Sequence, residues 1–202
     1  MDLYKKYHVS IGSNIGDRLE NIQSSLDLIH SRIASLTGIS CIYESESIGF
    51  DGDDFYNICA SFFSNISPHL VMQQLLEIEK TLGRNRSDET KYISRIIDID
   101  ILLIEDLVID SEELKVPHPE ICNRRFVMEP LIEIDPNLIH PVSKVSLKEI
   151  HEAFDQNQKI QKKDLVLNNP GNLLSIRNYN YIAIEGNIGS GKTSLSKQIS
   201  AD

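Results

Sequence analysis

The most informative stretch of the sequence runs from Arg95 to Leu103, where isoleucines alternate with two aspartates. Because side chains alternate between the two faces of a β-strand, we expect the core to receive Ile97, Ile99, Ile101 and Leu103. Asp98 and Asp100 would then share the opposite face, with their Cα atoms about 6.5 Å apart. Their mutual repulsion favours a bound cation, and Mg²⁺, which prefers oxygen ligands, could link them to the phosphates of ATP. The alternative is an acidic pair on a solvated sheet face.

Basic residues gather around this acidic strand in a chain that is acidic as a whole. The formal net charge is −10, yet a short part of the sequence contains Arg84, Arg86, Lys91, Arg95, Arg124 and Arg125. Transfer of phosphoryl groups depends on positioning and charge neutralisation, which arginine and lysine supply. A local basic pocket in an acidic protein suits a small anionic ligand better than a polymer. The alternative for each of these residues is a surface ion pair.

Two further groups of residues suit ligand binding. Phe55 and Asn57 share one face of a predicted strand, where a ring could stack on a flat heterocycle and an amide could pair with its edge. His118 lies between Pro117 and Pro119 and could donate a hydrogen bond to a phosphate. Both groups have a structural alternative, since phenylalanine in a strand commonly belongs to the core and a single loop histidine is commonly exposed.

The last part of the sequence contains a different phosphate-binding pattern. An apolar segment, residues 181–184, precedes Glu185–Ser194, which fits G-x-x-x-x-G-K-[ST]. The backbone amides of such a loop hold phosphates, and the residues that define the pattern are Gly186, Gly191, Lys192 and Thr193. The sequence given ends at Asp202, before a parallel sheet could form around the loop. We therefore expect this piece to be inactive.

Hydrophobic periodicity predicts an alternation of strands and helices. The predicted strands cover residues 7–11, 39–47, 55–64 and 96–104. One helix should begin after Asp17, which forms a capping box with Glu20, and end at Gly38; another should run from Pro68 to Gly83. This βαββαβ order is the ferredoxin-like pattern and predicts an α+β fold, with an antiparallel-rich sheet and both helices on one face. Extra elements are expected at 107–109, 124–134 and 147–154.

Composition shifts predict a division of the chain into unequal parts. Residues 156–163 are polar, and Pro170-Gly171 breaks regular structure. We expect a main domain over residues 1–160, a linker over 161–178 and a truncated P-loop strand–loop–helix fragment over 179–202.

Composition also restricts where the protein works and what it binds. Its 41% hydrophobic and 25% charged residues are ordinary for a globular protein. The three cysteines lack a paired spacing, which favours reduced thiols and a cytoplasmic location. No apolar stretch approaches the roughly 20 residues of a membrane-spanning helix, and the negative charge argues against nucleic acid. The sequence does not indicate an oligomeric state.

Several motifs occur in a characteristic order along the chain: Gly12-Ser13-Asn14, Phe55-x-Asn57, Glu79 before Gly83-Arg84, Arg95-x-x-Asp98-x-Asp100, Pro117-His118 and Arg124-x-Phe126. Over roughly residues 5 to 155, this combination closely resembles the 6-hydroxymethyl-7,8-dihydropterin pyrophosphokinases of the folate pathway. The resemblance implies Mg²⁺-dependent transfer of pyrophosphate from ATP to the hydroxymethyl group of the pterin, with release of AMP.

The resemblance also implies roles for the matched positions. Asp98 and Asp100 would hold two Mg²⁺ ions and form the catalytic set together with Arg84 and Arg95. Contacts with ATP would come from Glu79, Arg84, Arg86, Lys91, Arg95, Ile101, His118 and Arg124. The pterin would be held by Ser45, Ile48, Phe55, Asn57 and Phe126, with the two rings stacking on its faces.

Some positions depart from the family pattern. Tyr92-Ile93-Ser94 precedes Arg95 where the family usually has Trp-Gly-Pro, which changes the stiffness of that loop. Glu46-Ser47 stands where a proline-rich segment is usual, and Phe55 and Pro119 each stand where tyrosine is common.

Two alternative functions remain open from the sequence. Residues 185–192 resemble the phosphate loop at the start of deoxyribonucleoside kinases, so the chain is expected to be part of a bifunctional fusion or a gene product cut short. In the second alternative, the main domain is a ferredoxin-like binding module without catalysis.

Overall fold

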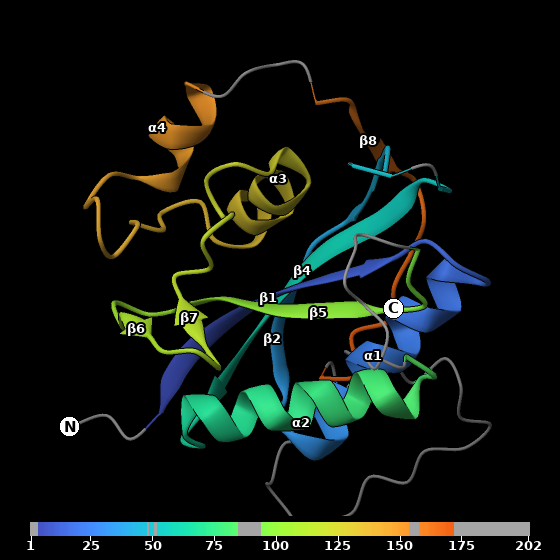
Figure 1. Ribbon diagram of the computed structural model, residues 1–202, viewed down its shortest axis with the longest axis horizontal. Coiled ribbons are helices and arrows are strands. Elements are labelled where there is room, and N and C mark those ends of the chain that lie inside the picture. Colours follow the sequence, from blue (N-terminus) through green and yellow to red (C-terminus); the bar gives the residue numbers. More distant parts are fainter. Residues whose placement is uncertain (1–3, 48, 51, 85–93, 154–157, 172–202) are drawn as a thin grey trace, which may run out of the picture.

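The computed structural model describes residues 4–47, 49–50, 52–84, 94–153 and 158–171. Its centre is a sheet with the strand order β5-β1-β4-β3-β8, and a further strand, β2, pairs with β4 (Figure 1). All of these pairs are antiparallel. The strands of this sheet are β1 Lys5–Ser13, β2 Leu36–Ile39, β3 Ile42–Ser45, β4 Phe55–Ser64, β5 Asp98–Ile104 and β8 Ile160–Lys163. The predicted α+β fold with an antiparallel sheet is confirmed.

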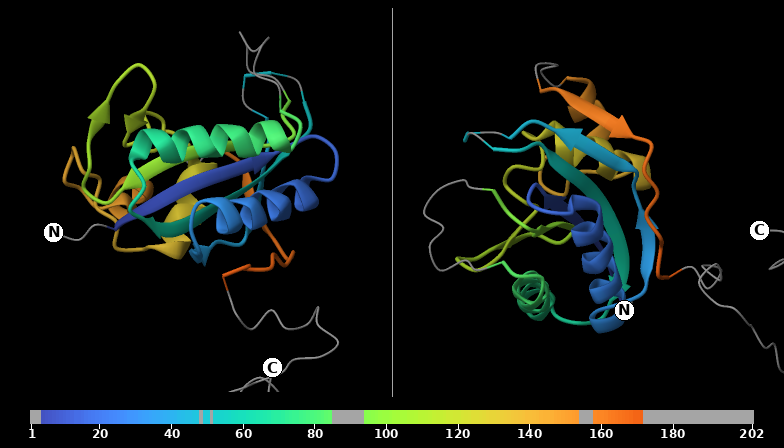
Figure 2. Two further views of the ribbon diagram at one scale, coloured as in Figure 1. Left: turned by 90° about the horizontal axis from the view of Figure 1, so that it is seen from below. Right: turned by 90° about the vertical axis from the view of Figure 1, so that its right-hand side faces the viewer.

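Helices cover both faces of the sheet. The helices α1 (Arg18–Arg32) and α2 (Pro68–Thr81) lie side by side on one face, as predicted (Figure 2). The helices α3 (Arg125–Ile134) and α4 (Leu147–Glu152) cover the other face. A small second sheet joins β6 (Ile109–Asp110) to β7 (Lys115–Val116). In the described part of the chain, no helix is long and apolar enough to span a bilayer.

The start of α1 follows its sequence signal, but its end does not. The Asp17 side chain accepts a hydrogen bond from the backbone N–H of Glu20 at 3.1 Å, as expected of an N-cap. The helix ends at Arg32, so the prediction that it extends to Gly38 was wrong. Leu36 and Gly38 belong to β2 instead, because pairing with β4 satisfies their backbone groups. A Cβ atom on Gly38 would lie 2.9 Å from Ser61 Oγ, so glycine permits this close approach.

The second helix matches its prediction closely. Pro68 occupies the first turn of α2, where its missing N–H costs no hydrogen bond. Gly83, just past the C-terminal end, has φ of +99°, a conformation that favours glycine. Val71, Leu75 and Ile78 form the buried face of the helix.

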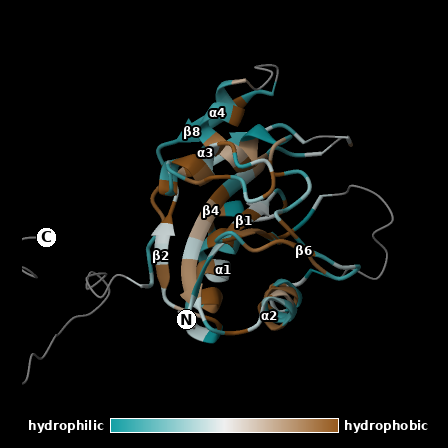
Figure 3. Ribbon diagram, turned by 90° about the vertical axis from the view of Figure 1, so that its left-hand side faces the viewer, coloured by the Kyte–Doolittle hydropathy of each residue, from teal (hydrophilic) through white to brown (hydrophobic). Residues whose placement is uncertain are grey.

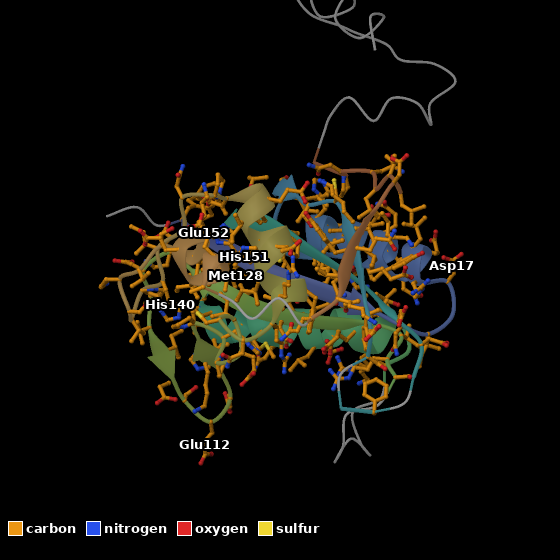
Figure 4. All side chains as sticks on the ribbon, turned by 90° about the horizontal axis from the view of Figure 1, so that it is seen from above. Asp17, Glu112, Met128, His140, His151 and Glu152 are labelled. Atoms are coloured by element: carbon orange, nitrogen blue, oxygen red, sulfur yellow. The ribbon has the colours of Figure 1, made fainter. Side chains whose placement is uncertain are left out.

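The sheet separates two hydrophobic cores. The larger lies under α1 and α2, where Ile22, Leu26 and Leu75 pack against the strands. The smaller lies under α3 and α4 and contains Met128 and Leu147. Hydrophobic colour is concentrated on the central strands, whereas α4 and β8 at the periphery show hydrophilic stretches (Figure 3). Figure 4 labels Met128 on α3 and His151 on α4, the two helices that cover this smaller core.

One predicted core position lies on the other face. Ile97, Ile99 and Ile101 are buried in the larger core, as expected, but Leu103 packs in the smaller one. The register with β1 shifts at this point, since Val9 pairs with Ile101 and His8 pairs with Leu103. The bulge inserts Leu102 between these pairs and reverses the alternation beyond it.

The C-terminal part of the described chain belongs to the sheet. Residues 161–163, expected to begin a linker, lie in β8 and pair with β3. Beyond β8, Leu165 and Leu167 pack against the larger core, and the main-chain N–H of Asn168 donates to Gln23 Oε1 on α1. The predicted P-loop fragment, residues 179–202, lies outside the described residues.

Candidate active site

A pocket of about 270 Å³ opens beside the sheet, between β3, β4 and β5 and the start of α3. Most of the predicted site residues that the structure describes line it. They are Ser45, Phe55, Asn57, Arg95, Asp98, Asp100, Arg124 and Phe126. The structure therefore brings together residues that are widely separated in the sequence and that come from several elements.

The two aspartates project from β5 into this pocket, as their alternation predicts. On the neighbouring strand β1, Gly12 pairs with Asp98 and Ser10 pairs with Asp100. Both of these small residues also line the pocket. A Cβ atom on Gly12 would lie 3.3 Å from the side-chain oxygen of Asn57. Small residues opposite the aspartates therefore leave open space above the carboxylates.

Asp98 is held between two arginines. Arg84 Nη1 donates to its Oδ1, and Arg95 Nη1 donates to its Oδ2 at 2.5 Å. Burial alone would raise the pKa of Asp98, but the charges and hydrogen bonds of the two arginines lower it below its ordinary value. Asp98 is therefore ionised across the physiological pH range. Its hydrogen bonds also hold the Arg84 and Arg95 side chains against the start of β5.

A buried ion pair behind the pocket anchors the aspartate strand. Glu79 on α2 is 1% exposed, and its Oε1 accepts hydrogen bonds from Arg84 Nη1 and from the backbone N–H of Ile99, both at 2.8 Å. Arg84 also donates to the carbonyl of Ile97 at 3.1 Å. From the sequence, we expect Glu79 and Arg84 to contact ATP. In the structure they join α2 to β5 and do not line the pocket.

A second cluster forms the side of the pocket opposite the aspartates. Asn57 is buried, and its Nδ2 donates to Ser45 Oγ at 3.0 Å. The Phe55 ring lies edge-on to Phe50, with a centroid separation of 6.3 Å. Phe126, at the start of α3, contributes another ring to the lining. Phe50 lines the pocket as well, so three aromatic rings and an amide share one space, an arrangement that suits a flat heterocycle.

His118 lies beside the aspartates without lining the pocket. Its Nε2 is 3.9 Å from Asp100 Oδ2, and its Nδ1 accepts a hydrogen bond from the backbone N–H of Glu120 at 3.1 Å. The backbone N–H of His118 donates to the carbonyl of Leu102 at 2.9 Å, which fixes the loop against β5. The hydrogen bond at Nδ1 leaves the proton of a neutral imidazole on Nε2, the atom that faces Asp100.

The remaining predicted site residues fall elsewhere. The side chain of Ile101 is 2% exposed in the larger core, so only its main chain could contact a ligand. Ile48, Arg86 and Lys91 lie outside the described residues, and so do Gly186, Gly191, Lys192 and Thr193 of the P-loop pattern.

Sequence reasoning missed other residues of the lining. Glu120 and Gln158 both line the pocket. Glu120 follows the proline–histidine segment directly, so its nearness to that motif was a usable signal. Gln158 lies in a polar stretch that resembles a linker, and no local pattern marks it.

The donor set of the pocket fits Mg²⁺. Mg²⁺ is commonly bound through one or two carboxylates, with substrate phosphates and water as its other ligands. Asp98 and Asp100 supply two carboxylates in one pocket, and an oxygen that accepts one hydrogen bond retains a further lone pair. No group of three or more His, Cys, Asp or Glu side chains with metal-binding geometry occurs among the described residues. A cation here would therefore need the oxygens of a ligand as well.

Comparisons with known proteins identify named relatives of this chain. The chain is 37% identical to the 2-amino-4-hydroxy-6-hydroxymethyldihydropteridine pyrophosphokinase of Aquifex aeolicus over 143 residues, or 70% of this chain and 88% of that protein. It is 36% identical to the Bacillus subtilis enzyme of the same name, over 63% of this chain and 76% of that one. With the folic acid synthesis protein fol1 of Pneumocystis carinii it shares 33% identity, over 73% of this chain but 20% of the longer protein.

The fold has counterparts among solved structures, and the sequence matches a defined family. The Plasmodium falciparum HPPK-DHPS structure with SDX-DHP superimposes with a TM-score of 0.61 at 13% identity, over 74% of this chain and 44% of that one. Residues 8–136 match the family described as 7,8-dihydro-6-hydroxymethylpterin-pyrophosphokinase, HPPK. This chain therefore belongs to the HPPK family.

Proposed function

We propose that this protein transfers pyrophosphate from ATP to the hydroxymethyl group of 6-hydroxymethyl-7,8-dihydropterin in folate synthesis, in the pocket that Asp98 and Asp100 share. The named relatives, with 36–37% identity, support the activity. The observation that carries the assignment to this pocket is that both carboxylates, two arginines and three aromatic rings line one space.

The aspartate side of the pocket would bind the phosphates of ATP. Arg95 and Arg124 line it and carry the positive charge that a triphosphate requires. Asp98 and Asp100 would hold Mg²⁺, two ions in our proposal, which would neutralise phosphate charge when bound. Arg86, Lys91 and His118 are proposed as further phosphate contacts, and Glu79 and Arg84 as the support that keeps the aspartate strand in place. The main chain of Ile101 would contribute from the same strand.

The aromatic side would bind the pterin. Phe55 and Phe126 would stack on its two faces, and Asn57 would pair with its edge. The Asn57 amide already donates to Ser45 Oγ, so its orientation is set before a ligand enters. Ser45 and Ile48 are proposed as neighbouring contacts.

The two sides together define the reaction that we propose. The hydroxymethyl oxygen of the pterin attacks the β-phosphorus of ATP, forming a new P–O bond while the bond from that phosphorus to the oxygen of AMP breaks. The electron pair of the broken bond leaves with AMP, and the proton of the hydroxymethyl group passes to solvent water. The protein contributes alignment of the two substrates and stabilisation of the developing negative charge by Arg95 and the groups beside it.

The product distinguishes this reaction from ordinary phosphorylation. The purified chain should convert ATP and the dihydropterin alcohol into AMP and the pterin diphosphate when Mg²⁺ is present, and chelation of Mg²⁺ should stop the reaction. A variant with Asp98→Ala should release no AMP under the same conditions. Formation of ADP, or equal AMP release by wild type and variant, would contradict the proposal.

We further propose a ferredoxin-like domain that extends beyond residue 160 to include β8, followed by a linker and a nucleoside kinase fragment over 179–202, in a cytoplasmic protein. The strand order β5-β1-β4-β3 supports the ferredoxin-like classification. The pattern Gly186–Thr193 is the observation that favours a second activity in a longer product. Such a product should phosphorylate a deoxyribonucleoside with ADP as the product, and Lys192→Ala should abolish that activity while AMP release continues.

A further inference from the structure

Gln158 and strand β8 lie beyond the part of the chain that matches the HPPK family, which ends at residue 136. Gln158 nevertheless lines the same pocket as Asp98 and Phe126. The segment is therefore close enough to the site to influence it.

Gln158 caps the helix that carries one wall of the pocket. The first residues of α3 follow Arg124, whose side chain makes no capping hydrogen bond, so the helix start lacks a local cap. Gln158 Oε1 accepts a hydrogen bond from the backbone N–H of Arg125 at 2.8 Å, and its Nε2 donates to the carbonyl of Asn123 at 2.9 Å. The Gln158 carbonyl also accepts from Arg125 Nη1 at 3.3 Å. A distant side chain thus performs the function of an N-cap.

The residues that follow Gln158 attach to the opposite wall. Ile160 pairs with Ser45, the last residue of β3 and a lining residue of the pocket. Lys159 Nζ lies 3.2 Å from Glu46 Oε1. Because Gln158 and β8 are adjacent in the chain, any movement of Gln158 relative to β3 is limited to the span of two residues.

We propose that Gln158 is a positioning residue that holds the start of α3, and with it Phe126, at a fixed distance from the β3 wall that carries Ser45. The inference rests on the proposed function, because it assigns the space between these two walls to the pterin. Gln158 would act through the main chain of residues 123–125. On the aspartate side, Asp98 begins β5 and Arg95 precedes that strand, so neither belongs to α3. Arg124 alone of the proposed phosphate contacts lies in the segment that Gln158 holds, so MgATP binding should weaken less than pterin binding.

The main test compares two matched substitutions. Gln158→Met keeps the length of the side chain but removes both of its hydrogen bonds, and Gln161→Met makes the same change at an exposed position of β8. A capping interaction is typically worth about 1 kcal/mol, which is roughly five-fold in a dissociation constant. We expect Gln158→Met to raise the dissociation constant and the KM for the pterin about five-fold. The kcat should stay near wild type, the MgATP constant should rise less than the pterin constant, and the Tm should fall by no more than about 2–4 °C. Every property of Gln161→Met should stay near wild type.

A conservative variant separates positioning from general loss of structure. Gln158→Glu retains an acceptor for the N–H of Arg125 at the positive end of α3, so it should recover most of the pterin affinity that Gln158→Met loses. Pterin binding by Gln158→Met at the wild-type constant would overturn the proposal. So would equal weakening of pterin and MgATP binding, or no recovery in Gln158→Glu. Failure of the proposed function would be seen separately, as absence of AMP formation by the wild type.

Discussion

Arg95 Nη1 lies 2.5 Å from Asp98 Oδ2, so a residue just before β5 neutralises the first of the two carboxylates on that strand. Arg84 contacts the other oxygen of Asp98 from the opposite side. The carboxylate thus has two functions in our interpretation, since it orients both arginines and remains the principal candidate ligand for Mg²⁺. Removal of its charge should affect both.

We therefore expect Asp98→Asn to lower kcat/KM for AMP formation by about 10³-fold or more, because positioned charge supplies most of the stabilisation in this class of reaction. The nearly isosteric amide can still contact the arginines, so the variant should remain folded in a urea titration. Asp106→Asn, an exposed position just after β5, is the matched control and should leave the rate unchanged. Comparable rates for the two variants would exclude Asp98 from the chemistry.

Glu79 should matter more for stability than any exposed acidic residue of α2. Glu79→Gln removes the charge that balances buried Arg84 and weakens the hydrogen bond to the N–H of Ile99. Breaking a buried ion pair from one side typically costs about 3–5 kcal/mol in the free energy of unfolding. Glu77→Gln changes an exposed residue of the same helix and should cost less than about 0.5 kcal/mol. Urea denaturation of both variants measures the difference, and equal midpoints would argue against the buried network.

Phe55 should contribute to pterin affinity through its ring. Phe55→Leu keeps an apolar side chain but removes the stacking surface, and we expect the pterin dissociation constant to rise about ten-fold, with MgATP binding unchanged. The control is Phe63→Leu on the same strand, because Phe63 is 45% exposed and lies far from the pocket lining. Titration calorimetry with the pterin gives both constants. A larger effect at Phe63 than at Phe55 would place the pterin elsewhere.

His8 should make stability depend on pH. Burial and the charge of Lys6 lower its pKa to about 4, although Asp135 opposes this change. The native protein therefore keeps His8 neutral, while the unfolded chain takes up a proton below pH 6.5. The stabilisation that comes from keeping His8 neutral is fully present above about pH 6.5 and is lost as the pH falls toward 4. Between pH 7 and pH 5, the free energy of unfolding should fall by about 2 kcal/mol.

The His8 prediction has a direct control. Urea titrations at pH 7 and pH 5 should show the loss in the wild-type protein, and His8→Gln should reduce it because glutamine does not titrate. The same slope in both proteins would mean that other groups determine the acid sensitivity.

The prediction of the fold succeeded where a signal was local. A capping signal predicts the role of Asp17, and helix periodicity predicts the buried face of α2. Strand periodicity predicts that Asp98 and Asp100 lie on the same face of β5. The end of α1 was wrong because Leu36 fits the continuing helical stripe as well as it fits β2. Only the available edge of β4 decides between the two.

The sequence by itself determined the family of this protein and indicated candidate chemistry, since the residue types and spacing of Arg95, Asp98, Asp100, Phe55 and Asn57 suit anions, a divalent cation and a flat ring. Tertiary structure alone decided that Glu79 and Arg84 join α2 to the aspartate strand, that Leu103 turns to the smaller core and that Gln158 lines the pocket. The physical reason is distance along the chain. A periodic pattern constrains neighbours within one element, whereas burial, register shifts and capping from afar depend on which elements pack together.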